Sequence, residues 1–123
     1  MDVIATQVAD LERRYPGARI EHAADGQRVL VVPDVPASQG WTPSAVTVRV
    51  VVPTGYPHVH PDCFYTEPDL RLASGGEPQN SSIQAVFGGQ YRWFSWHVAA
   101  WDAGNSSLDK YLRFCEQRLK DPR

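Results

Sequence analysis

Residues 45–52 read Ala-Val-Thr-Val-Arg-Val-Val-Val, and this alternation constrains the fold more than any other stretch of the chain. Successive side chains of a β-strand point to opposite faces of the sheet. One face of this segment therefore carries Thr47 and Arg49, and the other consists of Val46, Val48, Val50 and Val52. We predict a strand here, with its valine face turned toward the core.

Three further strands are predicted to form an antiparallel meander with this one. Residues 18–23 and 27–33 flank Asp25-Gly26, a dipeptide that easily adopts the positive backbone angles of a tight hairpin turn. Residues 63–66 are expected to form a short aromatic strand.

Two stretches are predicted to be loops. Residues 34–43 contain two prolines and a glycine, which interrupt a ladder of strand hydrogen bonds, so only Trp41 is expected to anchor this segment in the core. Residues 73–90 are rich in Gly, Ser, Asn and Gln and are expected to form a long loop, which is usually functional or mobile. The aromatic stretch 91–101 has no clean period and is expected to be irregular or one-turn helical.

A helix is predicted at each end of the chain. Near the N-terminus, apolar side chains recur at three- and four-residue steps before Pro16-Gly17, at Ile4, Val8, Leu11 and Tyr15. Near the C-terminus, Ser106 can cap a helix whose third residue is Asp109. The apolar stripe of this second helix consists of Leu108, Leu112, Cys115 and Leu119.

The composition indicates a soluble globular protein of one domain, residues 1–123. The formal net charge of −2 offers no basic face for nucleic acid. No apolar run approaches the ~20 residues that span a bilayer, so we expect no membrane association and a cytoplasmic location. The two cysteines lie too far apart for a paired-thiol zinc motif and favour free thiols in a reducing compartment. No cofactor is expected.

Several motifs carry a family resemblance. Tyr56-Pro57 follows the third predicted strand, Phe64-x-Thr66 occupies the fourth, and Trp101 precedes the last helix. This order resembles the ubiquitin-conjugating-enzyme (UBC-like) fold. The tail pattern Ser95-x-His97-x-x-x-Trp101 more specifically resembles the bacterial family called prokaryotic UBC-like family E. The resemblance implies an α+β fold with an N-terminal helix, a four-stranded antiparallel meander, a long loop and a C-terminal helix.

The resemblance also implies protein partners, and it shows where this chain differs from conjugating enzymes. Members of that family lie beside genes for ubiquitin-like proteins and activating enzymes, which are therefore the expected partners. In conjugating enzymes the thioester-forming cysteine lies roughly eight positions upstream of the tryptophan that matches Trp101. This chain has Arg92-Trp93-Phe94 there, and neither Cys63 nor Cys115 fills the place. The family tripeptide His-Pro-Asn is imitated by His60-Pro61-Asp62, which precedes the Phe-x-Thr strand instead of following it.

His97 is the first candidate for catalysis, because the resemblance places it next to the position of the missing cysteine. A histidine can act as a base or a transient acceptor near neutral pH. Ser95 can be a nucleophile only if the fold brings a base to it. The alternative for His97 is structural, as a ring wedged among tryptophans that caps a backbone carbonyl.

Cys63 with His58 and His60 offers the sulfur and nitrogen ligands that zinc prefers. Alternate side chains of a strand point the same way and Cys63 lies three positions beyond His60, so the three converge only if Pro61 bends the chain. Surface histidines in a turn are the alternative. For Cys63 to act as a reactive thiol its pKa must be lowered, and no lysine or arginine nearby in the sequence supplies that effect.

The aromatic cluster is expected to be mainly core, with one or two rings left exposed as a docking surface for a partner. The candidates for this role are Trp93, Phe94 and Trp96. The predicted function is a non-standard UBC-like component of a bacterial ubiquitin-like conjugation pathway. Three alternatives stay open: an inactive UBC-like adaptor, a cysteine-dependent enzyme that uses Cys63, and a small metal-binding protein.

Overall fold

The computed structural model describes residues 2–123, which form two helices and eight strands. In chain order the elements are α1 (Val3–Glu12), β1 (Arg19–His22), β2 (Arg28–Pro36), β3 (Trp41–Thr42), β4 (Ala45–Val52), β5 (Phe64–Thr66), β6 (Arg71–Leu72), β7 (Ser81–Val86), β8 (Gly89–Phe94) and α2 (Leu108–Leu119). No helix within residues 2–123 is long and apolar enough to cross a membrane.

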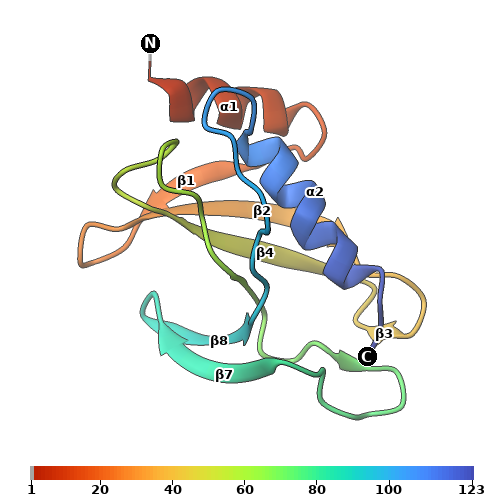
Figure 1. Ribbon diagram of the computed structural model, residues 1–123. Coiled ribbons are helices and arrows are strands. Elements are labelled where there is room, and N and C mark those ends of the chain that lie inside the picture. The colour runs from red at the N-terminus through yellow and green to blue at the C-terminus, as the bar shows by residue number, and fades with distance from the viewer. Residues whose placement is uncertain (1) are drawn as a thin grey trace.

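Six strands form one antiparallel sheet in the order β1-β2-β4-β5-β8-β7, and β3 pairs with β6 in a separate ribbon. Helix α2 crosses one face of the sheet, and α1 lies above the β1 edge (Figure 1). The predicted α+β class is confirmed. The sheet is larger than expected, because four strands were predicted for it.

The predicted valine strand is confirmed as β4, whose four even-numbered side chains are buried while the intervening ones are partly exposed. Strand β2 pairs with β4 along most of its length, and β1 joins β2 through the predicted hairpin at Asp25-Gly26. Gly26 has a φ of 87°, which a residue without a Cβ adopts at little steric cost.

The predicted loop at residues 34–43 is wrong at its beginning, because β2 continues through Pro36. Asp34 has a φ of 58°, and the pairing of β2 with β4 shifts its register at this point. The strand continues after this bulge, and a proline at the end of a strand costs few of the hydrogen bonds between strands. Trp41 anchors the following segment as predicted and is only 5% exposed.

The predicted long loop at residues 73–90 is wrong in its second half, where β7 and β8 form a hairpin. The two turn residues, Phe87 and Gly88, have φ values of 53° and 76°, as tight hairpin turns require. Such turns favour Asn or Asp at the first position, so a phenylalanine there obscured the pattern. Its ring lies 5.1 Å from that of Tyr65 and 5.7 Å from that of Tyr91. Residues 91–94, the start of the predicted irregular segment, belong to strand β8, whereas residues 95–101 are irregular as predicted.

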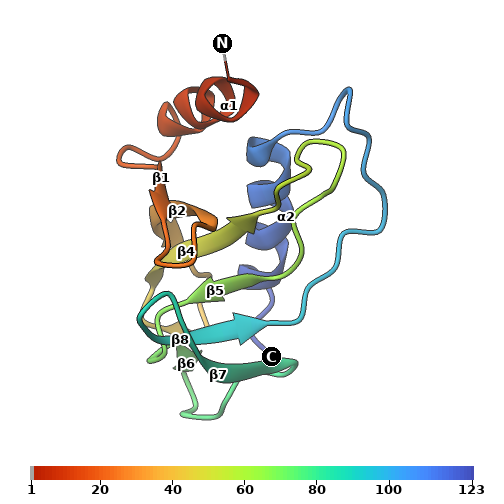
Figure 2. The ribbon, with the colours of Figure 1, turned by 90° about the vertical axis from the view of Figure 1, so that its left-hand side faces the viewer.

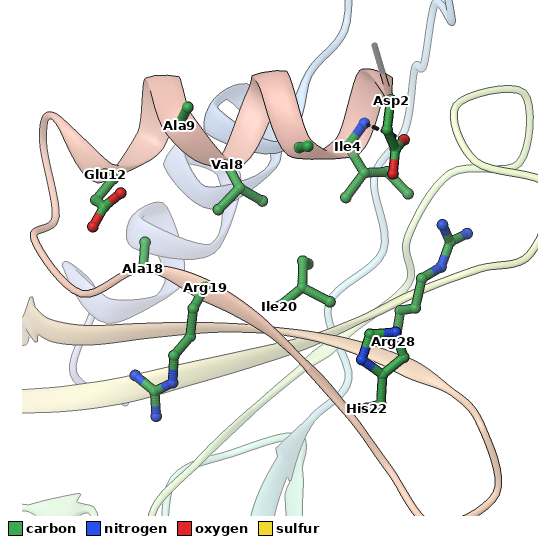
Figure 3. A pocket seen from close by; sticks show the side chains of 11 residues that line it. Asp2, Ile4, Val8, Ala9, Glu12, Ala18, Arg19, Ile20, His22 and Arg28 are labelled. Carbon is green, nitrogen blue, oxygen red and sulfur yellow. Dashed lines mark hydrogen bonds between the residues drawn. The ribbon is translucent and has the colours of Figure 1, made fainter.

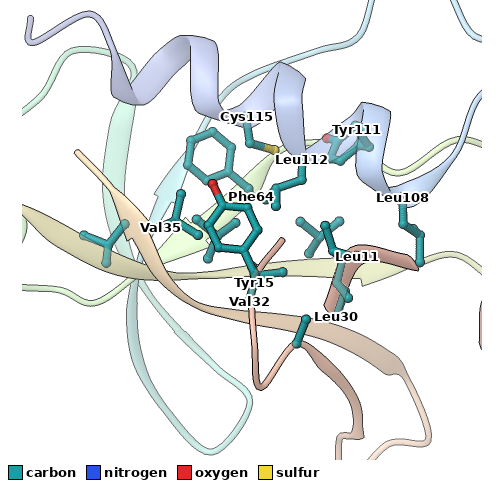
Figure 4. Close-up of a cluster of buried hydrophobic side chains, with 14 of the residues drawn as sticks. Leu11, Tyr15, Leu30, Val32, Val35, Phe64, Leu108, Tyr111, Leu112 and Cys115 are labelled. Atoms are coloured by element: carbon teal, nitrogen blue, oxygen red, sulfur yellow. The ribbon is translucent and has the colours of Figure 1, made fainter. Parts of the chain in front are cut away.

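Both helices begin with a capping side chain. The Asp2 carboxylate accepts a hydrogen bond from the Ile4 N–H at the start of α1. The cap of α2 is Ser107, one residue later than predicted, and its hydroxyl accepts from the Lys110 N–H. Helix α2 packs over the sheet (Figure 4), and the four predicted stripe residues are all 0% exposed: Leu108, Leu112, Cys115 and Leu119.

Two irregular segments, residues 53–62 and 95–107, lie side by side next to α2 (Figure 2). The Trp101 indole N–H donates to the Pro57 carbonyl at 2.7 Å, and the Cys63 N–H donates to the Trp96 carbonyl at 3.0 Å. These hydrogen bonds fix the two segments relative to each other. The residues predicted to carry chemistry lie on these segments or at their ends.

Candidate functional site

Three side chains form a continuous chain of hydrogen bonds where these two segments meet. His97 Nδ1 lies 2.7 Å from Asp62 Oδ1, and His97 Nε2 lies 3.0 Å from Ser95 Oγ. The side chains of His97 and Asp62 are 61% and 56% exposed, so a macromolecular substrate can reach them. The structure therefore brings together the two predicted residues, Ser95 and His97, and adds Asp62 to them.

This arrangement allows His97 to act as a base toward Ser95. When Nδ1 carries the ring proton and donates it to Asp62, Nε2 presents its lone pair to the Ser95 hydroxyl. The carboxylate holds the ring in this tautomer and stabilises the imidazolium that forms when Ser95 loses its proton. A hydroxyl, a histidine base and an orienting carboxylate are the parts of an activated nucleophile.

The pairing of β5 with β8 explains why these residues meet. Phe64 pairs with Phe94, so the segment that precedes β5 and the segment that follows β8 leave the sheet together. Cys63, between Asp62 and β5, has a φ of 60°, a rare backbone angle for a residue with a side chain. On the other segment, the Ser95 N–H donates to the Asn80 carbonyl at 2.8 Å.

Cys63 lies close to His97 but is poorly placed to react. Its Sγ is 3.8 Å from His97 Nδ1, yet the residue is only 5% exposed. Burial raises the pKa of the Cys63 thiol, and the nearby Asp62 carboxylate raises it further. Because the thiolate is the nucleophile, a protonated and buried thiol is a weak one.

Possible metal ligands also gather at this place. Residues 2–123 contain one group of three such side chains whose ligand atoms all lie within 4.8 Å of one another: Asp62, Cys63 and His97. The structure does not assemble the predicted set of His58, His60 and Cys63. The chain does turn here, but the His60 ring lies against Trp101, with ring centroids 6.3 Å apart.

The three aromatic residues predicted to contact a partner differ in burial. Phe94 is 0% exposed and stacks on Phe64 in the core, which leaves no surface for a partner and corrects that prediction. Trp96 is partly buried against α2, where its indole N–H donates to the Phe114 carbonyl at 2.8 Å. Trp93 is partly exposed on β8.

A groove of about 530 Å³ lies between α1 and β1 (Figure 3). Ile4 and Val8 of α1 and Ile20 of β1 line its apolar part, and Arg19 and Arg28 contribute guanidinium groups. It shares no residue with the hydrogen-bonded chain described above, so it is not part of the candidate site.

Asp62 is the site residue that sequence reasoning missed. In the sequence it stands out only as the last residue of a tripeptide that imitates a family motif in the wrong place. The pairing of two strands is the signal that could have placed Asp62 near Ser95 and His97. If residues 92–94 pair with residues 64–66, the residues just before β5 come close to those just after β8.

The family model of prokaryotic E2 family E matches residues 10–121, a range that contains Asp62, Ser95 and His97. No curated protein matches the chain, and no solved structure matches it. The family match extends over most of the 123 residues and agrees with the antiparallel α+β architecture. The chain therefore belongs to prokaryotic E2 family E, a bacterial family of UBC-like proteins.

Proposed function

We propose that this protein is a non-standard UBC-like component of a bacterial ubiquitin-like conjugation pathway in the cytoplasm. Its partners are an activating enzyme and a ubiquitin-like protein, and Ser95 receives the ubiquitin-like protein as an acyl group. The observation that carries this proposal is the hydrogen-bonded chain from Ser95 through His97 to Asp62. Family membership supports the pathway, but a fold alone does not establish activity, so the chemistry rests on this geometry.

The proposed reaction transfers the acyl group from a thioester on the activating enzyme to Ser95. As Ser95 Oγ attacks the thioester carbonyl, His97 Nε2 takes the hydroxyl proton. The carbon–sulfur bond breaks, the departing thiolate takes that proton from His97, and an oxyester to Ser95 remains. A target amine then attacks the ester and forms an amide, and the proton that the amine loses passes through His97 to the departing Ser95 oxygen.

Cys63 is the second candidate nucleophile, and the 3.8 Å between its Sγ and His97 Nδ1 is the observation in its favour. Two facts favour Ser95. Ser95 faces Nε2, which the contact with Asp62 leaves free, whereas Cys63 faces Nδ1, which Asp62 already engages. In addition, Ser95 is partly exposed while Cys63 is buried.

Trp93 and Trp96 are the proposed contacts for the ubiquitin-like protein or the activating enzyme. Both are partly exposed, and they precede and follow the Phe94-Ser95 pair in the chain. Tryptophan is among the residues that dominate binding energy at protein interfaces. A partner seated on these rings would bring its carboxyl terminus close to Ser95.

The test is a reconstituted reaction with the ubiquitin-like protein, the activating enzyme and ATP. Wild type is compared with Ser95→Ala and His97→Ala, and Ser44→Ala, at an exposed serine between β3 and β4, is the matched control. We expect wild type and the control to form a covalent adduct and Ser95→Ala to form none. The His97→Ala protein should form it more slowly by a factor on the order of 100.

A pull-down of the two partners separates chemistry from binding. All four proteins should retain the partners, since the substitutions leave Trp93 and Trp96 in place. Undiminished adduct formation by Ser95→Ala and His97→Ala contradicts the proposal. Adduct loss confined to Cys63→Ser assigns the chemistry to Cys63, and partner binding without any adduct in wild type identifies an inactive adaptor.

A further inference from the structure

The group formed by Asp62, Cys63 and His97 contains one residue that the proposed acyl transfer does not use. Cys63 has no part in that step, yet its sulfur lies 3.8 Å from the histidine that does. Thiolate, imidazole and carboxylate are the three ligand types that proteins use for Zn²⁺. From this juxtaposition we propose that Asp62, Cys63 and His97 bind one Zn²⁺ ion, with water in the fourth position.

The separations between the ligand atoms suit a tetrahedral ion. Zinc–ligand bonds of about 2.0–2.3 Å place neighbouring ligand atoms about 3.2–3.6 Å apart. His97 Nδ1 lies 2.7 Å from Asp62 Oδ1 and 3.8 Å from Cys63 Sγ, two distances that bracket that range, and the three ligand atoms all lie within 4.8 Å of one another. The side chains of Asp62 and His97 are both more than half exposed, so each has room to make the small adjustment required.

The backbone holds Cys63 in place. The Cys63 N–H donates to the Trp96 carbonyl at 3.0 Å, and the buried Tyr111 hydroxyl donates to the Cys63 carbonyl at 2.8 Å. The φ of 60° at Cys63 is an uncommon conformation that these contacts maintain. The sulfur is therefore a fixed ligand, toward which the two exposed side chains can close.

Ser95 supplies the outer contact that a metal-bound histidine needs. Ligating histidines usually donate their second ring N–H to an oxygen acceptor, which fixes the tautomer. With zinc on Nδ1, the Nε2–H of His97 donates to Ser95 Oγ, which lies 3.0 Å away. A sulfur and an imidazole ligand favour zinc over Mg²⁺ or Ca²⁺, which prefer oxygen ligands alone.

Zinc at this site has a consequence that rests on the proposed function. Binding releases the Cys63 thiol proton to solvent, and the ring proton of His97 moves from Nδ1 to Nε2. His97 then has no lone pair for the Ser95 proton, so it cannot act as a base. The bound ion therefore inhibits acyl transfer, and removing it restores the reaction.

The site is tested first without partners. Protein freed of metal by a chelator is titrated with Co²⁺ and then with Zn²⁺. We expect one equivalent of Co²⁺ to bind with a cobalt–thiolate charge-transfer band, and Zn²⁺ to displace it. The band should be absent from Cys63→Ser, and Asp62→Asn and His97→Ala should bind at least about tenfold more weakly. The controls His58→Ala and His60→Ala should bind as wild type does, and circular dichroism confirms that each variant is folded.

Three results overturn the site: no stoichiometric binding to wild type, a charge-transfer band that persists in Cys63→Ser, or binding that is lost in His58→Ala. The inhibitory role is tested separately, by adding saturating Zn²⁺ to the reconstituted reaction. Unchanged adduct formation overturns that role while the site stands. The proposed function fails by a different result. In the reaction without zinc, Ser95→Ala and His97→Ala would then form the adduct as well as wild type does.

Discussion

Asp62 Oδ1 lies 2.7 Å from His97 Nδ1, although 35 positions separate the two residues in the sequence. Both side chains are more than half exposed, and a polar contact between exposed side chains contributes little to stability. A role in the fold therefore gives a weak explanation for the contact. Orienting His97 so that Nε2 faces Ser95 at 3.0 Å explains it better.

Asp62→Asn should slow adduct formation while leaving the fold intact. The neutral amide neither fixes the Nδ1–H tautomer nor stabilises the imidazolium, so we expect a loss in rate on the order of 10- to 100-fold. The free energy of unfolding should change by less than about 0.5 kcal/mol. Asp69→Asn, at another exposed position, should change neither the rate of adduct formation nor the free energy of unfolding. A wild-type rate in Asp62→Asn contradicts the assigned role.

Cys63 should react slowly with iodoacetamide at neutral pH. The residue is 5% exposed, and burial raises the pKa of its thiol, so little thiolate is present to react. Labelling followed by peptide mapping should show Cys63 modified at least about tenfold more slowly than in urea-unfolded protein. Cys115, which is 0% exposed, serves as the internal reference. Equal rates for Cys63 in the folded and unfolded protein exclude the buried thiol described here.

Asp109→Asn should destabilise the protein at neutral pH but not in acid. Burial raises the pKa of Asp109, but hydrogen bonds from Arg14 and Arg113 outweigh it and hold the pKa below its ordinary value. The stability gained is present above the unfolded-state pKa of about 3.9. It is lost as the pH falls through the lower folded-state pKa, because the unfolded chain takes up the proton first.

Urea unfolding of wild type and Asp109→Asn, near pH 7 and at a pH below 4, measures this effect. We expect a difference of about 1 kcal/mol near neutrality, discounted because the group is partly exposed, and a smaller one in acid. Asp10→Asn, at an exposed position of α1, is the control and should show neither. A difference that grows in acid has the wrong sign for this account.

Arg118 should be a charged residue whose loss strongly destabilises the fold. It is 2% exposed, and its guanidinium donates to three backbone carbonyls near the C-terminal end, those of Gln79, Asp121 and Arg123. Arg118→Ala leaves the Gln79 and Asp121 carbonyls without this donor, while the Arg123 carbonyl keeps the Gln79 N–H, so we expect a loss of about 3 kcal/mol in the free energy of unfolding. Arg113→Ala, where the side chain is 59% exposed, should cost less than about 0.5 kcal/mol. Equal effects in chemical denaturation would contradict this account of Arg118.

The parts of the fold with a regular pattern could be predicted from the sequence. The valine alternation located β4, Asp25-Gly26 located the first hairpin, and the helical stripe located α2, because each pattern reflects one buried face. Hairpin β7–β8 could not be found this way. It lies at the sheet edge, where β7 has no buried residue and therefore no buried face to mark it, and its turn begins with Phe87, which neighbouring aromatic rings accommodate.

The candidate site was predictable to the same limited extent. Ser95 and His97 stood out through a local motif with family spacing. Asp62 and Cys63 join them only through the register of β5 with β8, a long-range pairing that the missed strand concealed. Local sequence also carried no sign that Phe94 would be fully buried while Trp93 stays partly exposed, because that depends on which face of β8 meets the core.

The most direct measurement of the central claim is the chemical nature and position of the adduct with the ubiquitin-like protein. The adduct is isolated from the reconstituted reaction, treated with excess thiol or with mild alkali, and mapped by mass spectrometry. An oxyester on Ser95 predicts an adduct that survives thiol, is cleaved by alkali and maps to Ser95. An adduct that thiol cleaves and that maps to Cys63 would contradict the claim.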